Sequence, residues 1–112
     1  MATLSTHVLD TALGRPAAGL GVTLQILEGG AWRELSRGAT DADGRIAKHL
    51  LAPDGVGPGT YQLIFESGAY LSRAHGKGFF PYAPIVFEVT EDQHYHVPLL
   101  LSPYGLATYR GS

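Results

Sequence analysis

Two histidines at alternate positions of one segment are well suited to proton transfer near neutral pH, where imidazole titrates. His94 and His96 lie in the stretch HYHVPLLLS over residues 94–102, which has the period of two that a β-strand requires. The bulkier row of this segment should face the core, and it consists of Tyr95, Val97, Leu99 and Leu101. Both imidazoles are therefore expected to point outward.

His7 and Arg45 are further candidates for the same chemistry. His7 lies in the opposite row from Leu4 and Val8, so it should point outward if those two side chains pack inward. Outward imidazoles near a cation make an acid–base site for hydrolysis, and a guanidinium suits an anionic or carbonyl-rich planar ligand. Ordinary surface histidines and a solvated arginine at a strand edge would give the same pattern, so spacing alone leaves both interpretations open.

A zinc site is the alternative use of the same histidines. His94 and His96 would point the same way, and His7 or His49 would complete a three-histidine set with one open position. The segment 94–102 contains no carboxylate that could orient these imidazoles, as the ligands of a zinc site usually require. We therefore predict no metal.

The motif Asp41-Ala42-Asp43-Gly44 resembles part of a calcium-binding loop. Aligning Gly44 with the invariant glycine of such a loop places Ala39 and Leu50 where carboxylates are needed. A turn explains the motif better, because Asp side chains cap their own backbone and Gly accepts a positive φ. This turn should deliver Arg45 to the start of a short strand.

The elements that must position these residues are mostly short strands. Fifteen Gly and seven Pro are spread along the whole chain, as in folds with frequent turns. The pattern predicts strands over residues 20–28, 32–37, 61–65, 85–89, 94–102 and 106–110, besides the N-terminal strand and the short one at Arg45, and a two-turn helix over residues 67–75. We expect one all-β domain over residues 1–112, an antiparallel two-sheet sandwich of about eight strands with one short helix.

Composition narrows the possible partners and chemistry. The 112 residues carry a formal charge of −2 and no Cys, which argues against nucleic-acid binding as the main role and excludes a Cys nucleophile. Ser5, Ser102 and Ser112 lack a nucleophile-elbow pattern. No signal peptide or membrane-spanning segment is evident, so we expect a protein of the cytoplasm without membrane contact.

Three segments of the chain together resemble the 5-hydroxyisourate hydrolase family, which is related to transthyretin. They are residues 5–10 (STHVLD), 94–103 (HYHVPLLLSP) and the C-terminal 108–112 (TYRGS). The similarity covers essentially the whole chain, and the ending Tyr-Arg-Gly-Ser is highly specific to that family. The motifs around Gly14, Asp41 and Pro58 resemble prealbumin-like sandwiches more generally and indicate the fold only.

The resemblance implies a hydrolase of urate catabolism with the prealbumin-like fold. Such enzymes open the ring of 5-hydroxyisourate to give 2-oxo-4-hydroxy-4-carboxy-5-ureidoimidazoline, and they need no cofactor. It implies His7, Arg45, His96 and Ser112 as catalytic residues, with Tyr109, Arg110 and Gly111 as further substrate-binding residues. Either His7 or His96 would be the general base.

The resemblance also implies a homotetramer with its sites at the contact between two dimers. Outward histidines have no pocket unless another subunit covers them, so this assembly agrees with the strand pattern. A transthyretin-like carrier of small ligands, without catalysis, is the alternative function.

Overall fold

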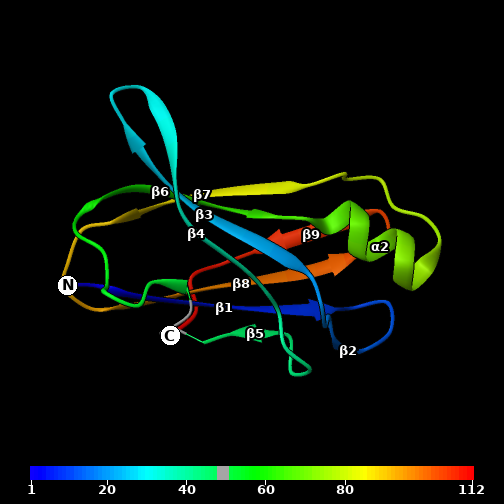
Figure 1. Cartoon of the computed structure of the whole chain (residues 1–112). Coiled ribbons are helices and arrows are strands. Elements are labelled where there is room, and N and C mark those ends of the chain that lie inside the picture. Colours follow the sequence, from blue (N-terminus) through cyan, green and yellow to red (C-terminus); the bar gives the residue numbers. More distant parts are fainter. Residues whose placement is uncertain (48–50) are drawn as a thin grey trace.

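Two sheets packed face to face make up the protein (Figure 1). The computed structural model describes residues 1–47 and 51–112. Its strands are β1 (Thr3–Asp10), β2 (Arg15–Pro16), β3 (Gly21–Glu28), β4 (Ala31–Ala39), β5 (Arg45–Ile46), β6 (Gly59–Phe65), β7 (Ala83–Val89), β8 (His94–Ser102) and β9 (Gly105–Thr108), and its helix is α2 (Ser67–His75). One sheet has the order β2-β1-β8-β9 with β5 also on β1, and the other has the order β4-β3-β6-β7.

The predicted sandwich is therefore confirmed, and the predicted helix has the same bounds as α2. The β3–β4 hairpin projects beyond the sandwich (Figure 1), with a turn at Gly29 and Gly30, both at positive φ. The last predicted strand, 106–110, is shifted: β9 ends at Thr108. Tyr109 and Arg110 therefore lie outside the β8–β9 ladder, and their backbone is not held in the pairing of that ladder.

β1 and β8 pair in parallel, whereas every other strand pair of the described chain is antiparallel. The ladder runs through eight residue pairs, from Thr3 opposite His94 to Asp10 opposite Leu101. Residues directly opposite each other project to the same side of a sheet. The N-terminal motif and the histidine motif, about 90 positions apart in the sequence, are thereby placed side by side.

The core lies between the sheets and is built from alternate residues of each strand. In β1, Leu4 and Val8 are fully buried, and in β8 Leu99 and Leu101 are as well, while His7 and His96 are half-buried on the opposite face. The predicted inward rows are confirmed. Burial of each such apolar side chain contributes roughly 1.5–3 kcal/mol to the free energy of folding. Because side chains alternate along a strand, burying this row turns the histidines to the outer face.

A buried carboxylate fastens α2 to the end of β1. Oδ2 of Asp10 accepts a hydrogen bond from the Tyr70 hydroxyl (2.6 Å) and lies 2.8 Å from Nε2 of His75, while Oδ1 accepts the N–H groups of Ala12 and Leu13 at 3.1 and 3.0 Å. Burial alone would raise the pKa of Asp10, but these hydrogen bonds outweigh it and hold the pKa below its usual value. Burial and the neighbouring carboxylate raise the pKa of Tyr70 to about 12.

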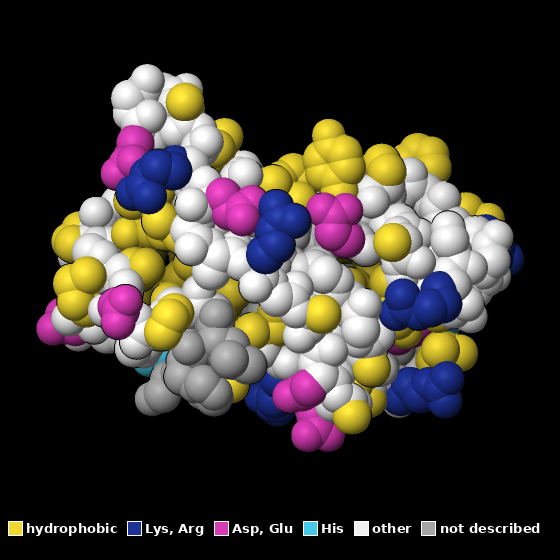
Figure 2. Space-filling view, in the orientation of Figure 1, with side chains coloured by type: hydrophobic (Ala, Val, Ile, Leu, Met, Phe, Trp, Pro, Cys, Tyr) yellow, Lys and Arg dark blue, Asp and Glu magenta, His cyan; other side chains and the backbone are white. Residues whose placement is uncertain are grey.

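The face shown in Figure 2 carries acidic and basic side chains next to one another, and only small areas of histidine are visible on it. Two ion pairs, Arg33 with Glu28 and Arg37 with Glu34, lie on the surface of the β3–β4 hairpin. Exposed pairs of this kind contribute little stability. No helix among the described residues is long and apolar enough to cross a membrane.

Asp10→Asn should lower the free energy of unfolding by about 3 kcal/mol at neutral pH, because a buried charged acceptor with several donors is lost. Since the folded-state pKa of Asp10 lies below its ordinary value, its stabilisation is present above that ordinary value. It is lost as the pH falls through the folded-state pKa. Urea titrations from neutral pH to below pH 4 should therefore show the two proteins converging in acid.

Asp43→Asn is the matched control, because Asp43 is exposed in the turn before β5. It should change the stability by less than about 0.5 kcal/mol. Equal stability of Asp10→Asn and the parent protein at neutral pH would show that the carboxylate network does not stabilise the fold.

Candidate active site

A tight turn places Arg45 directly opposite His7. Oδ1 of Asp41 accepts the N–H groups of Asp43 (2.9 Å) and Arg45 (3.0 Å), so the predicted turn is confirmed. Gly44 has φ of 75°, and a Cβ there would lie 2.5 Å from the carbonyl oxygen of Val8. Only glycine lets this turn approach β1 closely enough for β5 to pair with it, with Arg45 as the partner of His7.

His96 lies on the other side of β1, on the same outer face. Its partner in the parallel ladder is Ser5, whereas His7 pairs with Pro98. His7 and His96 are thus diagonal neighbours, with Cα atoms roughly 8 Å apart for a strand spacing of ~4.8 Å and a rise of ~3.3 Å per residue. Both histidines are half-buried and Arg45 is exposed, so the structure brings together these three predicted residues.

Two sides of the His96 ring are held by neighbours. Ser5 Oγ lies 2.7 Å from Nδ1, and Gly111 approaches the Cδ2 edge so closely that a Cβ at position 111 would lie 2.5 Å from that atom. Within residues 1–47 and 51–112, Nε2 has no hydrogen-bond partner. This nitrogen is the one left to meet a ligand.

The pKa of His96 is lowered from its usual value, mainly by burial and further by the positive charges of Arg45, His7 and His94. A histidine with a lowered pKa is predominantly neutral at neutral pH. The imidazole is therefore ready to accept a proton there.

The C-terminal residues return across β8 to reach this site. The Thr108 hydroxyl donates to the carbonyl oxygen of Pro98 (2.7 Å), and the N–H of Gly111 donates to the carbonyl oxygen of His96 (2.8 Å). Ser112 follows Gly111 and is exposed. Tyr109 is 57% exposed, so its ring remains available to a ligand or a second subunit.

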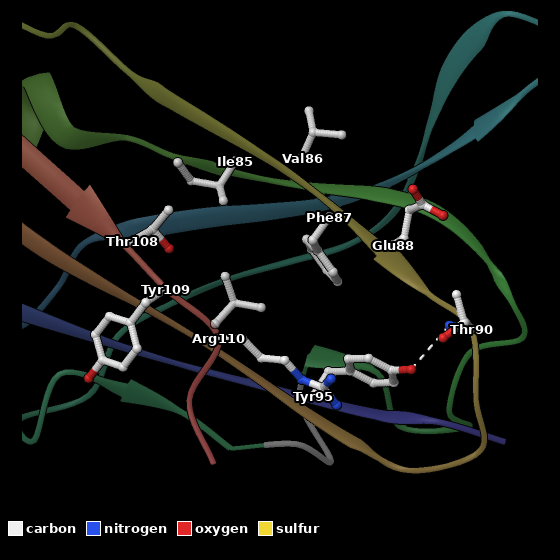
Figure 3. Close-up of a pocket in the computed structure, with 10 residues that line it drawn as sticks. Ile85, Val86, Phe87, Glu88, Thr90, Tyr95, Thr108, Tyr109 and Arg110 are labelled. Carbon is white, nitrogen blue, oxygen red and sulfur yellow. Dashed lines mark hydrogen bonds between the residues drawn. The ribbon is translucent and has the colours of Figure 1, made fainter.

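Arg110 takes a different direction from the other predicted binding residues. Its guanidinium lies 4.5 Å from the centre of the Tyr95 ring, within a cavity between β7 and β8 (Figure 3). Tyr95 belongs to the inward row of β8, and Figure 3 shows Arg110 and Tyr109 pointing to opposite sides. The Arg110 guanidinium therefore lies on the side of β8 that carries Tyr95, opposite to the face that carries His96.

Thr3 and Ser5, which the sequence did not single out for this site, complete its surroundings together with His94. Ser5 Oγ bridges Nδ1 of His96 and Nε2 of His94 with two contacts of 2.7 Å, and Thr3 Oγ1 lies 2.6 Å from Nδ1 of His94. The signal available was that Thr3, Ser5 and His7 alternate on one face. The partner strand and its register were not evident from the sequence.

The zinc alternative depends in part on residues outside the described chain. No group of three or more His, Asp or Glu side chains in the described residues is arranged to hold a metal ion. His49, one of the two candidate third ligands, lies outside those residues. In the structure, the facing ring nitrogens of His94 and His96 share the hydroxyl of Ser5.

Comparison with known proteins agrees with this geometry. A model described as the HIUase/Transthyretin family matches residues 4–111. The chain belongs to this family. A curated family member, the 5-hydroxyisourate hydrolase of Mesorhizobium japonicum, is 50% identical over 97% of this chain and 91% of its own.

Two solved structures of the family have the same fold. The 5-hydroxyisourate hydrolase of Klebsiella pneumoniae superposes with a TM-score of 0.87 at 41% identity, over 98% of this chain and 99% of that one. Sea bream transthyretin, solved in complex with thyroxine, has a TM-score of 0.90 at 29% identity, over 96% and 93%. The fold thus accommodates both an enzyme and a hormone-binding protein, and the function must be argued from the site.

Gly111→Ala should displace the His96 ring, because the new methyl group would lie 2.5 Å from Cδ2. The backbone of Gly111 is not in the left-handed region, so the fold should tolerate alanine. We expect shifted NMR signals of the His96 ring and a nearly unchanged melting temperature. Gly57→Ala is the control, since a Cβ there meets nothing within 4 Å. Unchanged His96 signals in Gly111→Ala would refute the close contact.

Proposed function

We propose that this chain hydrolyses 5-hydroxyisourate at the site formed by His7, Arg45 and His96. The observation that carries the proposal is the meeting of two imidazoles and a guanidinium on one outer face of the sheet, with the pKa of His96 lowered by burial and by Arg45. We name 5-hydroxyisourate as the substrate because the similar hydrolases are named for it.

The roles follow from the charge and position of each group. His96 has a lowered pKa, so it is suited to take a proton from the attacking water through Nε2. Arg45 would hold the electron-rich ring and offset the charge that develops on the carbonyl oxygen. His7, opposite Arg45, would protonate the departing ring nitrogen. The water oxygen bonds to the carbonyl carbon as the ring carbon–nitrogen bond breaks.

The C-terminal residues would position the substrate. Gly111 lies against His96, and Ser112 follows it and is exposed. Tyr109 is also exposed, at the edge of the cavity that Arg110 enters. Arg110 is assigned a different role from the other three, because its guanidinium stacks on Tyr95. By fixing the course of residues 109–112, it would hold the chain end over the site without touching the substrate.

The direct test is the decay of freshly made 5-hydroxyisourate with catalytic amounts of this protein. The parent protein should accelerate the decay clearly above the spontaneous rate. His7→Ala and His96→Ala should each lower kcat by about 100-fold to 10,000-fold, as expected for a lost proton-transfer group. Circular dichroism should show an unchanged fold, because both side chains point away from the core.

Arg45→Ala should also lose activity, and Arg37→Ala is its control, since Arg37 is exposed on β4 and pairs with Glu34. Parental rates in both histidine variants would refute the assigned site. Binding of small ligands by the parent protein without any turnover would support the carrier function instead.

We further propose that the working form is a homotetramer whose subunits cover one another's sites at the contact between two dimers. His7 and His96 are only half-buried in one chain, and Arg45 is exposed. A second copy over this face would exclude water and fix the surrounding dipoles, which strengthens electrostatic catalysis.

Light scattering should give a mass four times that of the 11.9 kDa chain. Leu100→Lys places a charge on the outer face of β8, which the proposal buries in the assembly. It should dissociate the tetramer and lower turnover while leaving each chain folded. Leu27→Lys, on the 40% exposed side chain of β3, is the control. A fully active monomer of the parent protein would contradict this arrangement.

A further inference from the structure

A continuous chain of hydrogen-bonding groups leads from His96 to the exposed edge of the site. Nδ1 of His96 lies 2.7 Å from Ser5 Oγ, which lies 2.7 Å from Nε2 of His94. Nδ1 of His94 lies 2.6 Å from Thr3 Oγ1. His96 is half-buried, whereas His94 is exposed. Every link joins groups that can both donate and accept a proton.

The single hydroxyl hydrogen of Ser5 gives this chain a direction. Ser5 donates to one imidazole and must accept from the other, because each neutral imidazole has one donor and one acceptor nitrogen. When Ser5 donates to His94, Nδ1 of His96 carries its hydrogen and Nε2 presents a lone pair toward the site. When Ser5 donates to His96, the order is reversed and Nε2 carries the hydrogen. The two arrangements differ only in the positions of hydrogens.

We propose that Ser5 and His94, assisted by Thr3, form a proton relay between His96 and solvent. The inference rests on the proposed hydrolysis, in which Nε2 of His96 takes a proton from water. The relay would return His96 to its neutral state without requiring bulk water to enter the site. Ser5 and His94 act through His96, so they are positioning residues that do not contact the substrate.

In each turnover His96 gains a proton from water and His7 loses one to the ring nitrogen, so His96 needs an exit for its proton while His7 regains one from solvent. Opening a cyclic amide to a carboxylate near neutral pH releases one proton per turnover, because the ureido nitrogen that leaves stays uncharged. After Nε2 of His96 has accepted a proton, its Nδ1 hydrogen passes to Ser5 Oγ as the Ser5 hydroxyl hydrogen passes to Nε2 of His94. His94 then holds the positive charge and loses its Nδ1 proton to solvent by way of Thr3, which leaves His96 neutral with its hydrogen on Nε2. Once the product has left the site, the same movement in reverse returns a hydrogen to Nδ1 as the Nε2 hydrogen passes to solvent, and His96 is again able to act as base.

The surroundings favour movement of the charge outward. His96 faces Arg45 from β5, His7 from β1 and His94 from its own strand, and residues 111–112 bring no titratable side chain. A positive charge on His96 is therefore both partly desolvated and close to a permanent cation. His94 is exposed, so a positive charge that reaches it is in contact with water.

His94→Gln separates relay from structure, because an amide can hydrogen-bond to Ser5 but cannot carry a proton near neutral pH. In dilute buffer, kcat should fall by about tenfold or more. The loss should stay below the ~100-fold that removal of a general base typically causes. KM should be unchanged. Rising concentrations of imidazole buffer should restore kcat, since a small carrier replaces the exposed histidine.

Ser5→Ala should lower kcat similarly, and Ser5→Thr, which keeps the hydroxyl on a strand residue, should restore most of it. A parental kcat for His94→Gln in dilute buffer would overturn the relay. That outcome would leave the proposed function intact as long as the parent protein turns over 5-hydroxyisourate and His96→Ala does not.

A readout without turnover tests the relay independently of the proposed function. Nitrogen-15 NMR distinguishes the protonated from the unprotonated ring nitrogens of each histidine. In the parent protein, protonating His94 should switch the tautomer of His96 through Ser5, and in Ser5→Ala this switch should be lost although the two charges still repel each other. A His96 tautomer that does not respond to protonation of His94 in the parent protein would overturn the proposal.

Discussion

The parallel pairing of β1 with β8 is the constraint on which the rest of the site depends. It sets Ser5 beside His96 and His7 beside Pro98, and it brings the two histidine-bearing strands together in the middle of a sheet. Because side chains alternate between the faces, a slip of one residue in either strand would turn its histidine into the core. The buried rows on both strands prevent such a slip, so core packing and site geometry are one requirement.

Titratable groups near the two ends of β1 lie in opposite environments: Asp10 on β1 itself, and His96 on β8, paired with Ser5. Asp10 is fully buried and holds its charge through hydrogen bonds from Tyr70, Leu13 and His75, which lower its pKa. His96, across the strand from Ser5, is kept neutral by burial and by nearby cations. The first arrangement stabilises the fold, whereas the second leaves a lone pair available for chemistry, as hydrolysis requires.

The C-terminal residues show how one short segment can serve two purposes. Gly111 fits against the His96 ring because it has no side chain, and Arg110 anchors the same segment by stacking on Tyr95 from the other side. Neighbouring residues of an extended chain point in opposite directions. Adjacent residues of this motif therefore contact opposite sides of β8, Gly111 against His96 and Arg110 against Tyr95.

The sequence by itself determined the sandwich, the helix at residues 67–75, the turn before Arg45 and the outward faces of His7 and His96. These are consequences of local chemistry and periodicity, which act between residues close along the chain. Only the tertiary structure decided that Thr3, Ser5 and His94 lie in a hydrogen-bonded chain with His96, and that Arg110 turns away. Those contacts depend on which strands pair, in which direction and in which register, and no local pattern encodes a partner about 90 residues away.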